Sequence, residues 1–168
     1  PFGAEPGEAS AQARARLRGP TLAPIEVHPR TPAMFARIRA ETPAYARFLI
    51  PPSFDEFRLR SRRAVFVDWK CVPMKGEEAL EWKRRMLSGL GLSELPANGY
   101  ALRRRAESIY LARDLAALEL LARRERLHYV VAHKDADRPP GLERWVAGAQ
   151  WRVYRVRTEA ETRLQERI

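Results

Sequence analysis

The stretch "SRRAVFVDWK", residues 61–70, contains the clearest strand signal in the sequence, "RAVFVDW" at 63–69. Its middle, residues 64–67, is a continuous apolar run, which is typical of a strand buried on both faces of a parallel sheet. The run ends in Asp68-Trp69-Lys70. Because residues i and i+2 of a strand point to the same face, we expect Asp68 and Lys70 to point toward one spot at the end of this strand.

Other strand and helix signals flank this stretch. Short apolar runs at 46–50 and 127–133 indicate buried strands, and "RWVAGAQ" and "WRVYRVR" (144–157) indicate two strands around a glycine-containing turn. Apolar spacing and helix-start or helix-stop residues predict helices over 31–42, 77–90 and 108–126. The order predicts an α/β fold in three layers, with helices on both faces of a mostly parallel sheet of about five strands. An antiparallel C-terminal hairpin is expected at the sheet edge.

The length of the chain suits one domain of ordinary size. Residues 1–30 carry five prolines and no sustained apolar period, so we expect a linker or extended arm there. A single α/β domain is predicted over 31–158, and a polar helical tail over 159–168.

The chain is strongly basic, with a formal net charge of +10, yet only four of its 31 basic residues are lysine. A basic surface favours nucleic acid or an anionic membrane surface as a partner. The arginine bias, together with abundant alanine and proline, is also typical of GC-rich coding sequence, so the charge alone does not select a partner. No apolar run is long enough to cross a bilayer, and the isolated chain is expected to be soluble. Its single cysteine cannot form an internal disulfide.

Two polar clusters follow the predicted parallel strands. Asp68-Trp69-Lys70 follows one strand and His133-Lys134-Asp135 follows another. Ligands of open α/β sheets collect beyond the carboxyl ends of parallel strands, so these clusters predict a pocket on one rim. The alternative is that they are solvated loop residues.

The acid-x-Lys pair at Asp68 and Lys70 also occurs in metal-dependent nucleases. Such a site needs a second carboxylate to hold Mg²⁺, for which Asp55 or Glu56 are the candidates, while the lysine activates or orients water. A metal-dependent nuclease or nucleic-acid-binding domain is therefore the alternative function. His128 and His133 lie an odd number of residues apart on one predicted strand and face opposite sides, so we expect no zinc site.

The segment from residue 42 to residue 73 resembles part of a known group of proteins. It is similar to the soluble C-terminal region of bacterial polytopic membrane proteins related to the membrane glycosyltransferases that use lipid-linked sugars, a group that includes the oligosaccharyltransferases. "YVVAH" and "WRVYRV" are later echoes of the same pattern. The residues that carry the resemblance are Thr42-Pro43, Pro51-Pro52, Phe57-Arg58, Ser61, Arg63-Ala64, Val67-Asp68-Trp69-Lys70, Pro73 and Glu81-Trp82.

The resemblance implies a non-catalytic accessory domain that is tethered to its own transmembrane region, on the extracytoplasmic (periplasmic) side. Catalytic acids would then lie in the membrane part, and we expect no catalytic residue, metal or cofactor in this chain. The Trp-Trp-Asp-Tyr-Gly motif by which oligosaccharyltransferases recognise their acceptor does not occur here.

The polar clusters at the strand ends and the resemblance both predict a binding site at one rim of the sheet. Arg58, Arg63 and Lys70 are candidates to bind a phosphate, either of an anionic lipid headgroup or of a lipid-linked sugar, with Asp68 orienting one of them. His133 and Lys134 are further candidates on the same rim. The alternative is that Asp68 pairs with an arginine and only fixes the loop. Nucleic acid is the less favoured partner.

Overall fold

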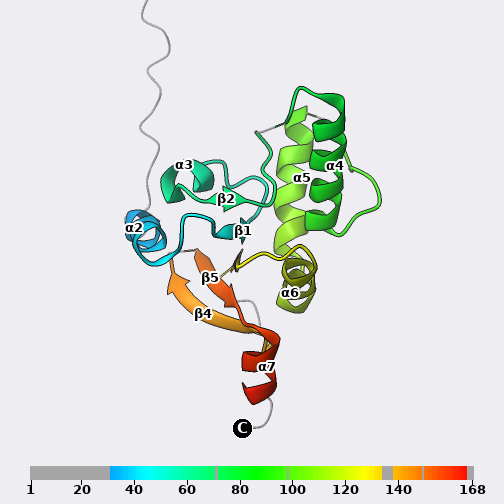
Figure 1. Cartoon of the computed structure of the whole chain (residues 1–168). Coiled ribbons are helices and arrows are strands. Elements are labelled where there is room, and N and C mark those ends of the chain that lie inside the picture. Colours follow the sequence, from blue (N-terminus) through cyan, green and yellow to red (C-terminus); the bar gives the residue numbers. More distant parts are fainter. Residues whose placement is uncertain (1–30, 71, 98, 134–137, 149, 166–168) are drawn as a thin grey trace, which may run out of the picture.

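A computed structural model describes residues 31–70, 72–97, 99–133, 138–148 and 150–165. Eleven helices and strands follow one another in this part of the chain (Figure 1). They are α2 (Thr31–Glu41), β1 (Arg47–Leu49), α3 (Phe57–Ser61), β2 (Ala64–Val65), α4 (Gly76–Leu90), α5 (Gly99–Leu111), α6 (Leu115–Arg124), β3 (Tyr129–His133), β4 (Leu142–Ala147), β5 (Trp151–Val156) and α7 (Glu159–Gln165). Over these residues, no helix has the length and apolar character needed to span a membrane. The predicted N-terminal arm lies outside the described residues.

The five strands form one mixed sheet in the order β2-β1-β3-β5-β4. β1 lies parallel to both β2 and β3, whereas β5 pairs antiparallel with β3 and with β4. The α/β fold with about five strands and an antiparallel C-terminal hairpin is therefore confirmed. Only the β2-β1-β3 half is parallel, because the hairpin inserts β5 directly beside β3 and adds two antiparallel pairings.

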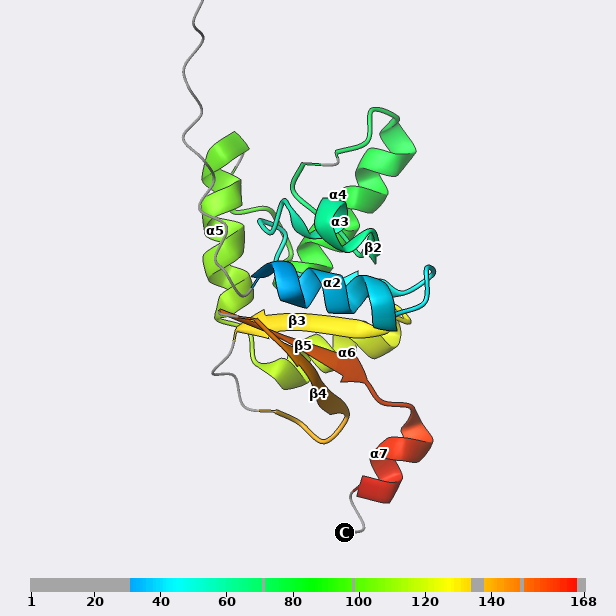
Figure 2. The ribbon, with the colours of Figure 1, turned by 90° about the vertical axis from the view of Figure 1, so that its left-hand side faces the viewer.

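Alternation along the strands divides the core into two clusters. Phe48 and Val131 belong to a cluster with the buried residues of α2 and α3, whereas Leu49 and Val130 belong to a cluster with α4, α5 and α6. Figure 2 shows α2 crossing in front of β3, with α6 behind it. Residues that alternate along β1 and β3 are thus buried on both faces, which explains why these strands read as continuous apolar runs.

The strand expected over 63–69 is much shorter in the structure. β2 contains only two residues and lies at the edge of the sheet. Phe66 and Val67 continue beyond it and are buried in the cluster that contains Met86 and Leu90 of α4. The apolar run at 64–67 is therefore explained by burial against α4 rather than by a central position in the sheet. The central strand is β3.

The long helix expected over 108–126 is two helices. α5 ends at Leu111 and α6 begins at Leu115, with Asp114 as its N-cap, where Asp114 Oδ1 accepts a 2.6 Å hydrogen bond from the Ala117 amide. The helix expected over 77–90 is confirmed as α4, and it ends at Gly91, whose φ of 71° suits glycine.

Candidate functional site

A groove of about 440 Å³ lies beside the segment that follows β2, and we call it the α3–α4 groove. Its walls come from α3, from the residues after β2 and from the first half of α4, so segments adjacent in the sequence build most of it. The residues that line it are Arg58, Val65, Phe66, Val67, Asp68, Pro73, Glu77, Glu78, Glu81, Trp82 and Arg85.

An indole is fixed in this groove. Trp82 Nε1 donates a 2.9 Å hydrogen bond to the backbone oxygen of Asp68, which connects α4 to the segment after β2. Trp82 is also packed against the core cluster that contains Met86. The ring is therefore held in one orientation by one polar and several apolar contacts before any ligand arrives.

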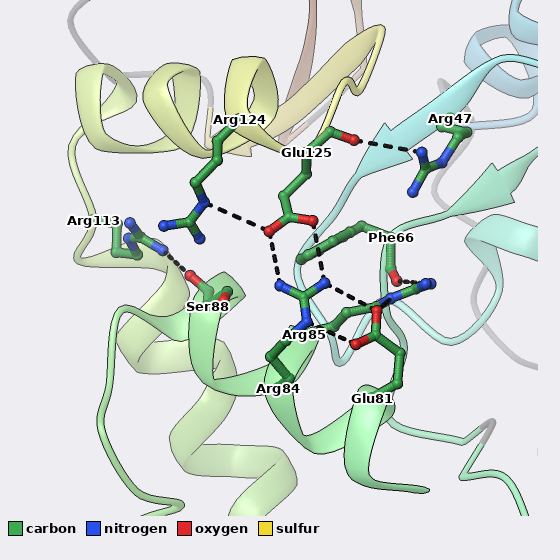
Figure 3. A network of polar contacts seen from close by, with 9 residues as sticks. All are labelled: Arg47, Phe66, Glu81, Arg84, Arg85, Ser88, Arg113, Arg124 and Glu125. Atoms are coloured by element: carbon green, nitrogen blue, oxygen red, sulfur yellow. Dashed lines mark hydrogen bonds and ion pairs between the residues drawn. The ribbon is translucent and has the colours of Figure 1, made fainter. Parts of the chain in front are cut away.

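Glu81 and Arg85 form the part of the groove that is already paired. Arg85 Nε donates a 2.7 Å hydrogen bond to Glu81 Oε1, and its Nη1 donates to the backbone oxygen of Phe66 (Figure 3). Arg84 binds the same carboxylate from the other side. The hydrogen bonds from Arg84 and then Arg85 lower the pKa of Glu81 from 4.5 to about 2, so this carboxylate is ionised at neutral pH.

The charge of the α3–α4 groove is opposite to that of the whole chain. Four carboxylates line it (Asp68, Glu77, Glu78 and Glu81) against two guanidinium groups, although the chain carries +10. Glu77 and Glu78 lie in the first turn of α4 and are exposed. Carboxylates accept hydrogen bonds and repel anions, so the groove disfavours an anionic ligand and offers acceptors to a ligand that carries hydrogen-bond donors.

Two of the predicted site residues line this groove, whereas Arg63 and Lys70 bind other residues. Asp68, only 8% exposed, and Arg58 both line the α3–α4 groove. Arg63 instead donates from Nε to Thr42 Oγ1 and from Nη2 to the backbone oxygens of Arg39 and Thr42, which closes the C-terminal end of α2.

Lys70 is paired with another acid, Asp55. Its Nζ lies 3.2 Å from Asp55 Oδ2, which also receives Arg103 Nη2 at 3.1 Å. Because β2 ends at Val65, the same-face rule for residues i and i+2 of a strand does not apply to Asp68 and Lys70, and the common direction expected of this pair stays a prediction.

The remaining candidates are His133 and Lys134, from the end of the second predicted strand. His133 ends β3, and its ring meets that of Trp151 edge-on, with 6.4 Å between the ring centroids. Lys134 lies outside the described residues. No cluster of three or more histidine, cysteine or acidic side chains suited to a metal ion occurs in the described part of the chain.

Sequence reasoning missed the acidic wall of the groove. Two glutamates at the start of a helix and a tryptophan on its apolar stripe are ordinary features, which the helix dipole and core packing explain, so Glu77, Glu78 and Trp82 do not stand out as site residues in the sequence. The signals that did point to this region were the candidate residues Arg58 and Asp68, and Glu81-Trp82 in the resemblance described above.

Comparisons with known proteins give one match. A family model described as a domain of unknown function (DUF6798) matches residues 29–88, a segment that contains every residue lining the α3–α4 groove. No curated protein and no solved structure matches the chain.

Proposed function

We propose that the chain is a non-catalytic accessory domain of a membrane glycosyltransferase-like protein, and that its α3–α4 groove binds the sugar part of a substrate. The resemblance of residues 42–73 to the soluble domains of such proteins supports the first half of the proposal. The shape and lining of the groove support the second half.

The observation that carries the proposal is the combination of a fixed indole with unpaired carboxylates. Glu77 and Glu78 make no hydrogen bond or ion pair with the described residues, and both line the same groove as Trp82. Sugars present hydroxyl donors at their edges and C–H groups on their faces, which suit carboxylate oxygens and an aromatic ring respectively. A phosphate would be repelled by the four carboxylates, so the groove is assigned to the uncharged ring of the sugar.

A second part of the proposal concerns the layers of the domain and its location at the membrane. The domain is a three-layer α/β unit on the extracytoplasmic side, tethered to its own transmembrane region. Core clusters on both faces of the sheet support the layered arrangement.

Saturation-transfer NMR tests the sugar site directly. We expect glucose and N-acetylglucosamine to receive magnetisation from the protein, and glucose 1-phosphate to receive less because of its charge. Glu78→Gln should change the transfer to each sugar, since it removes one acceptor charge from the wall. Trp82→Leu should abolish the transfer, with the fold checked by circular dichroism.

Glu107→Gln is the matched control, because Glu107 is an exposed acid on α5 that does not line the groove. A transfer that is absent for all sugars would refute the sugar site. A transfer that is unchanged in both groove variants would refute it equally.

The accessory role has its own test. In membranes that contain the complete gene product, deletion of residues 31–158 should lower sugar transfer, while the membrane part keeps a residual activity. A complete gene product without transmembrane segments would refute this role and leave the groove assignment standing.

A further inference from the structure

A second groove lies on the other side of α4. It has a volume of about 690 Å³ and runs between the C-terminal half of α4 and α6, and we call it the α4–α6 groove. Its lining combines two kinds of side chain. Arg84, Arg113 and Arg124 are cationic, and Leu87, Leu120 and Leu121 are apolar. Among the described residues, none that lines it is acidic.

Arg113 is held rigidly at the end of α4. Its Nη1 donates to the backbone oxygens of Ser88 and Gly89 at 2.8 and 2.7 Å. Its guanidinium also packs on Gly91, where a Cβ would lie 3.3 Å from Arg113 Cζ. The absence of a side chain at Gly91 therefore allows this cation to lie flat against the turn after α4.

The charge of Arg113 has no close counter-ion. No carboxylate lies within ion-pair distance of it in the part of the chain that the structure describes, and its contacts are carbonyl oxygens. Desolvation accordingly lowers the pKa of Arg113, whereas Arg84 beside Glu81 and Glu125 has a raised pKa. Asp114 adds a Coulomb attraction from beyond ion-pair distance, and the direct contacts of this half-buried cation are carbonyl oxygens, so an anion close by is favoured.

The other two cations leave an excess of positive charge. Figure 3 shows Arg84 and Arg124 beside the carboxylate of Glu125, with Arg113 farther along, beside Ser88. Arg84 is paired with Glu125, and Arg124 Nε lies 3.5 Å from the same carboxylate. Arg84 also binds Glu81, which is shared with Arg85, so two glutamates serve three arginines, while Arg113 has no ion pair among the described residues. The side chain of Arg124 is 65% exposed, so it can reorient toward a ligand.

The leucines make the rest of the groove apolar. Leu120 is 70% exposed on α6, whereas Leu118 and Leu121 of the same helix are buried in the core. Leu87 of α4 lies opposite in the lining. An exposed leucine that continues an apolar wall beside cations is suited to an aliphatic chain with an anionic head.

The geometry points to a binding site for a single anionic amphiphile in the α4–α6 groove. The phosphate head of an alkyl phosphate lies against Arg113 and Arg124, and the chain lies along Leu87, Leu120 and Leu121. The occupant is one lipid molecule in a groove rather than the surface of a bilayer. This assignment does not rest on the sugar site, because α4 presents different residues to the two grooves.

Isothermal titration calorimetry with octyl phosphate below its critical micelle concentration tests the site. We expect octyl phosphate to bind at least about tenfold more tightly than inorganic phosphate or the neutral amphiphile tetraethylene glycol monooctyl ether, because only octyl phosphate uses both halves of the groove. Raising the NaCl concentration from about 0.05 M to about 0.5 M should weaken the binding by screening the charges.

Two variants that leave the fold intact separate the contribution of the cationic half of the groove from that of its apolar half. Arg124→Gln and Leu120→Ser change exposed side chains, and each should weaken octyl phosphate binding by about fivefold or more. Arg104→Gln on α5 and Leu59→Ser on α3 are the matched controls, since both side chains are exposed and neither lines the groove. These controls should bind like the unmodified chain.

Three outcomes would overturn the assignment. The first is octyl phosphate binding that is absent or unchanged in both groove variants, and the second is inorganic phosphate binding just as tightly. The third comes from co-sedimentation with vesicles of phosphatidylcholine and phosphatidylglycerol. Sedimentation that is lost in Leu120→Ser, without any binding of monomeric octyl phosphate, would make this face a bilayer-docking surface instead. Equal sedimentation of the unmodified chain and Leu120→Ser, with octyl phosphate bound, supports the single-lipid site.

Discussion

Replacing Arg84 by glutamine should measurably loosen the connection between α4 and the end of α6. Arg84 Nη1 and Nη2 donate to the two carboxylate oxygens of Glu125 at 2.9 and 3.2 Å, across 41 positions of sequence. Nε and Nη2 also donate to Glu81, three residues earlier on α4 (Figure 3). The substitution removes the charge and most of these bonds while keeping a side chain of similar polarity.

The expected magnitude follows from the exposure of the partners. The Glu125 side chain is only 15% exposed, so its hydrogen bonds to a charged group would contribute about 1.5–3 kcal/mol if the pair were buried. Arg84 is 47% exposed, and solvent screening reduces that contribution by about half. The pair with Glu81 adds about 0.3–0.5 kcal/mol, as is usual for exposed neighbours on a helix. We expect the free energy of unfolding to fall by about 1–2 kcal/mol.

Urea unfolding followed by circular dichroism measures this loss, and a double-mutant cycle with Glu125→Gln isolates the pair. The coupling free energy should be about 1 kcal/mol. Arg163→Gln is the control, because its pair with Glu159 is 3.5 Å long and both side chains are mostly exposed, and it should change stability by less than about 0.5 kcal/mol.

The loss should also depend on pH in a defined direction. Arg84 and Arg85 lower the pKa of Glu81 from 4.5 to about 2, and Arg84 lowers that of Glu125. A lowered carboxyl pKa gives stability that is present above the unfolded value and disappears as the pH falls through the folded value. The difference between the unmodified chain and Arg84→Gln should therefore shrink from pH 4.5 toward pH 2. A difference that is independent of pH, or no larger than that of Arg163→Gln, would refute the reasoning.

Three further predictions concern other parts of the molecule. Tyr110→Phe should destabilise the chain by about 1 kcal/mol in urea unfolding, because the buried Tyr110 hydroxyl donates a 2.9 Å hydrogen bond to the backbone oxygen of Val131. Arg126→Gly should raise the midpoint of thermal unfolding, since Arg126 has a φ of 52° and glycine adopts this conformation without strain; an unchanged or lower midpoint would contradict this. With Mg²⁺ and plasmid DNA we expect no cleavage, because Lys70 is paired with Asp55 and no cluster of three or more metal-ligating side chains occurs among the described residues, whereas cleavage that disappears in Lys70→Ala would establish the nuclease alternative.

Much of the fold could be predicted from local patterns. The strand at 129–133, the helix at 76–90 and the C-terminal hairpin follow from continuous apolar runs, helical spacing and a glycine-containing turn, and each depends on residues close in sequence. The break between α5 and α6 was missed because the leucine spacing continues across it, and only the cap at Asp114 marks the start of the second helix.

The candidate site was predictable only in part. Asp68 and Arg58 do line a groove, but Arg63 and Lys70, which were expected beside them, bind the end of α2 and Asp55 instead. The partner of a long cationic side chain depends on which acceptor the fold brings near it, and local spacing holds no information on that.

The sequence by itself determined where α2, α4, β3 and the β4–β5 hairpin form, because the period of apolar residues and the turn residues act within a few positions along the chain. Only the tertiary structure decided the position of each strand in the sheet and the sign of the net charge of the side chains that line each groove. The run at 64–67 is as apolar as a central strand, yet it lies at the sheet edge because α4 rather than a neighbouring strand buries its second half. Likewise, a chain of charge +10 forms an acidic groove on one side of α4 and a basic groove on the other, since the helix turns its glutamates and arginines toward different neighbours.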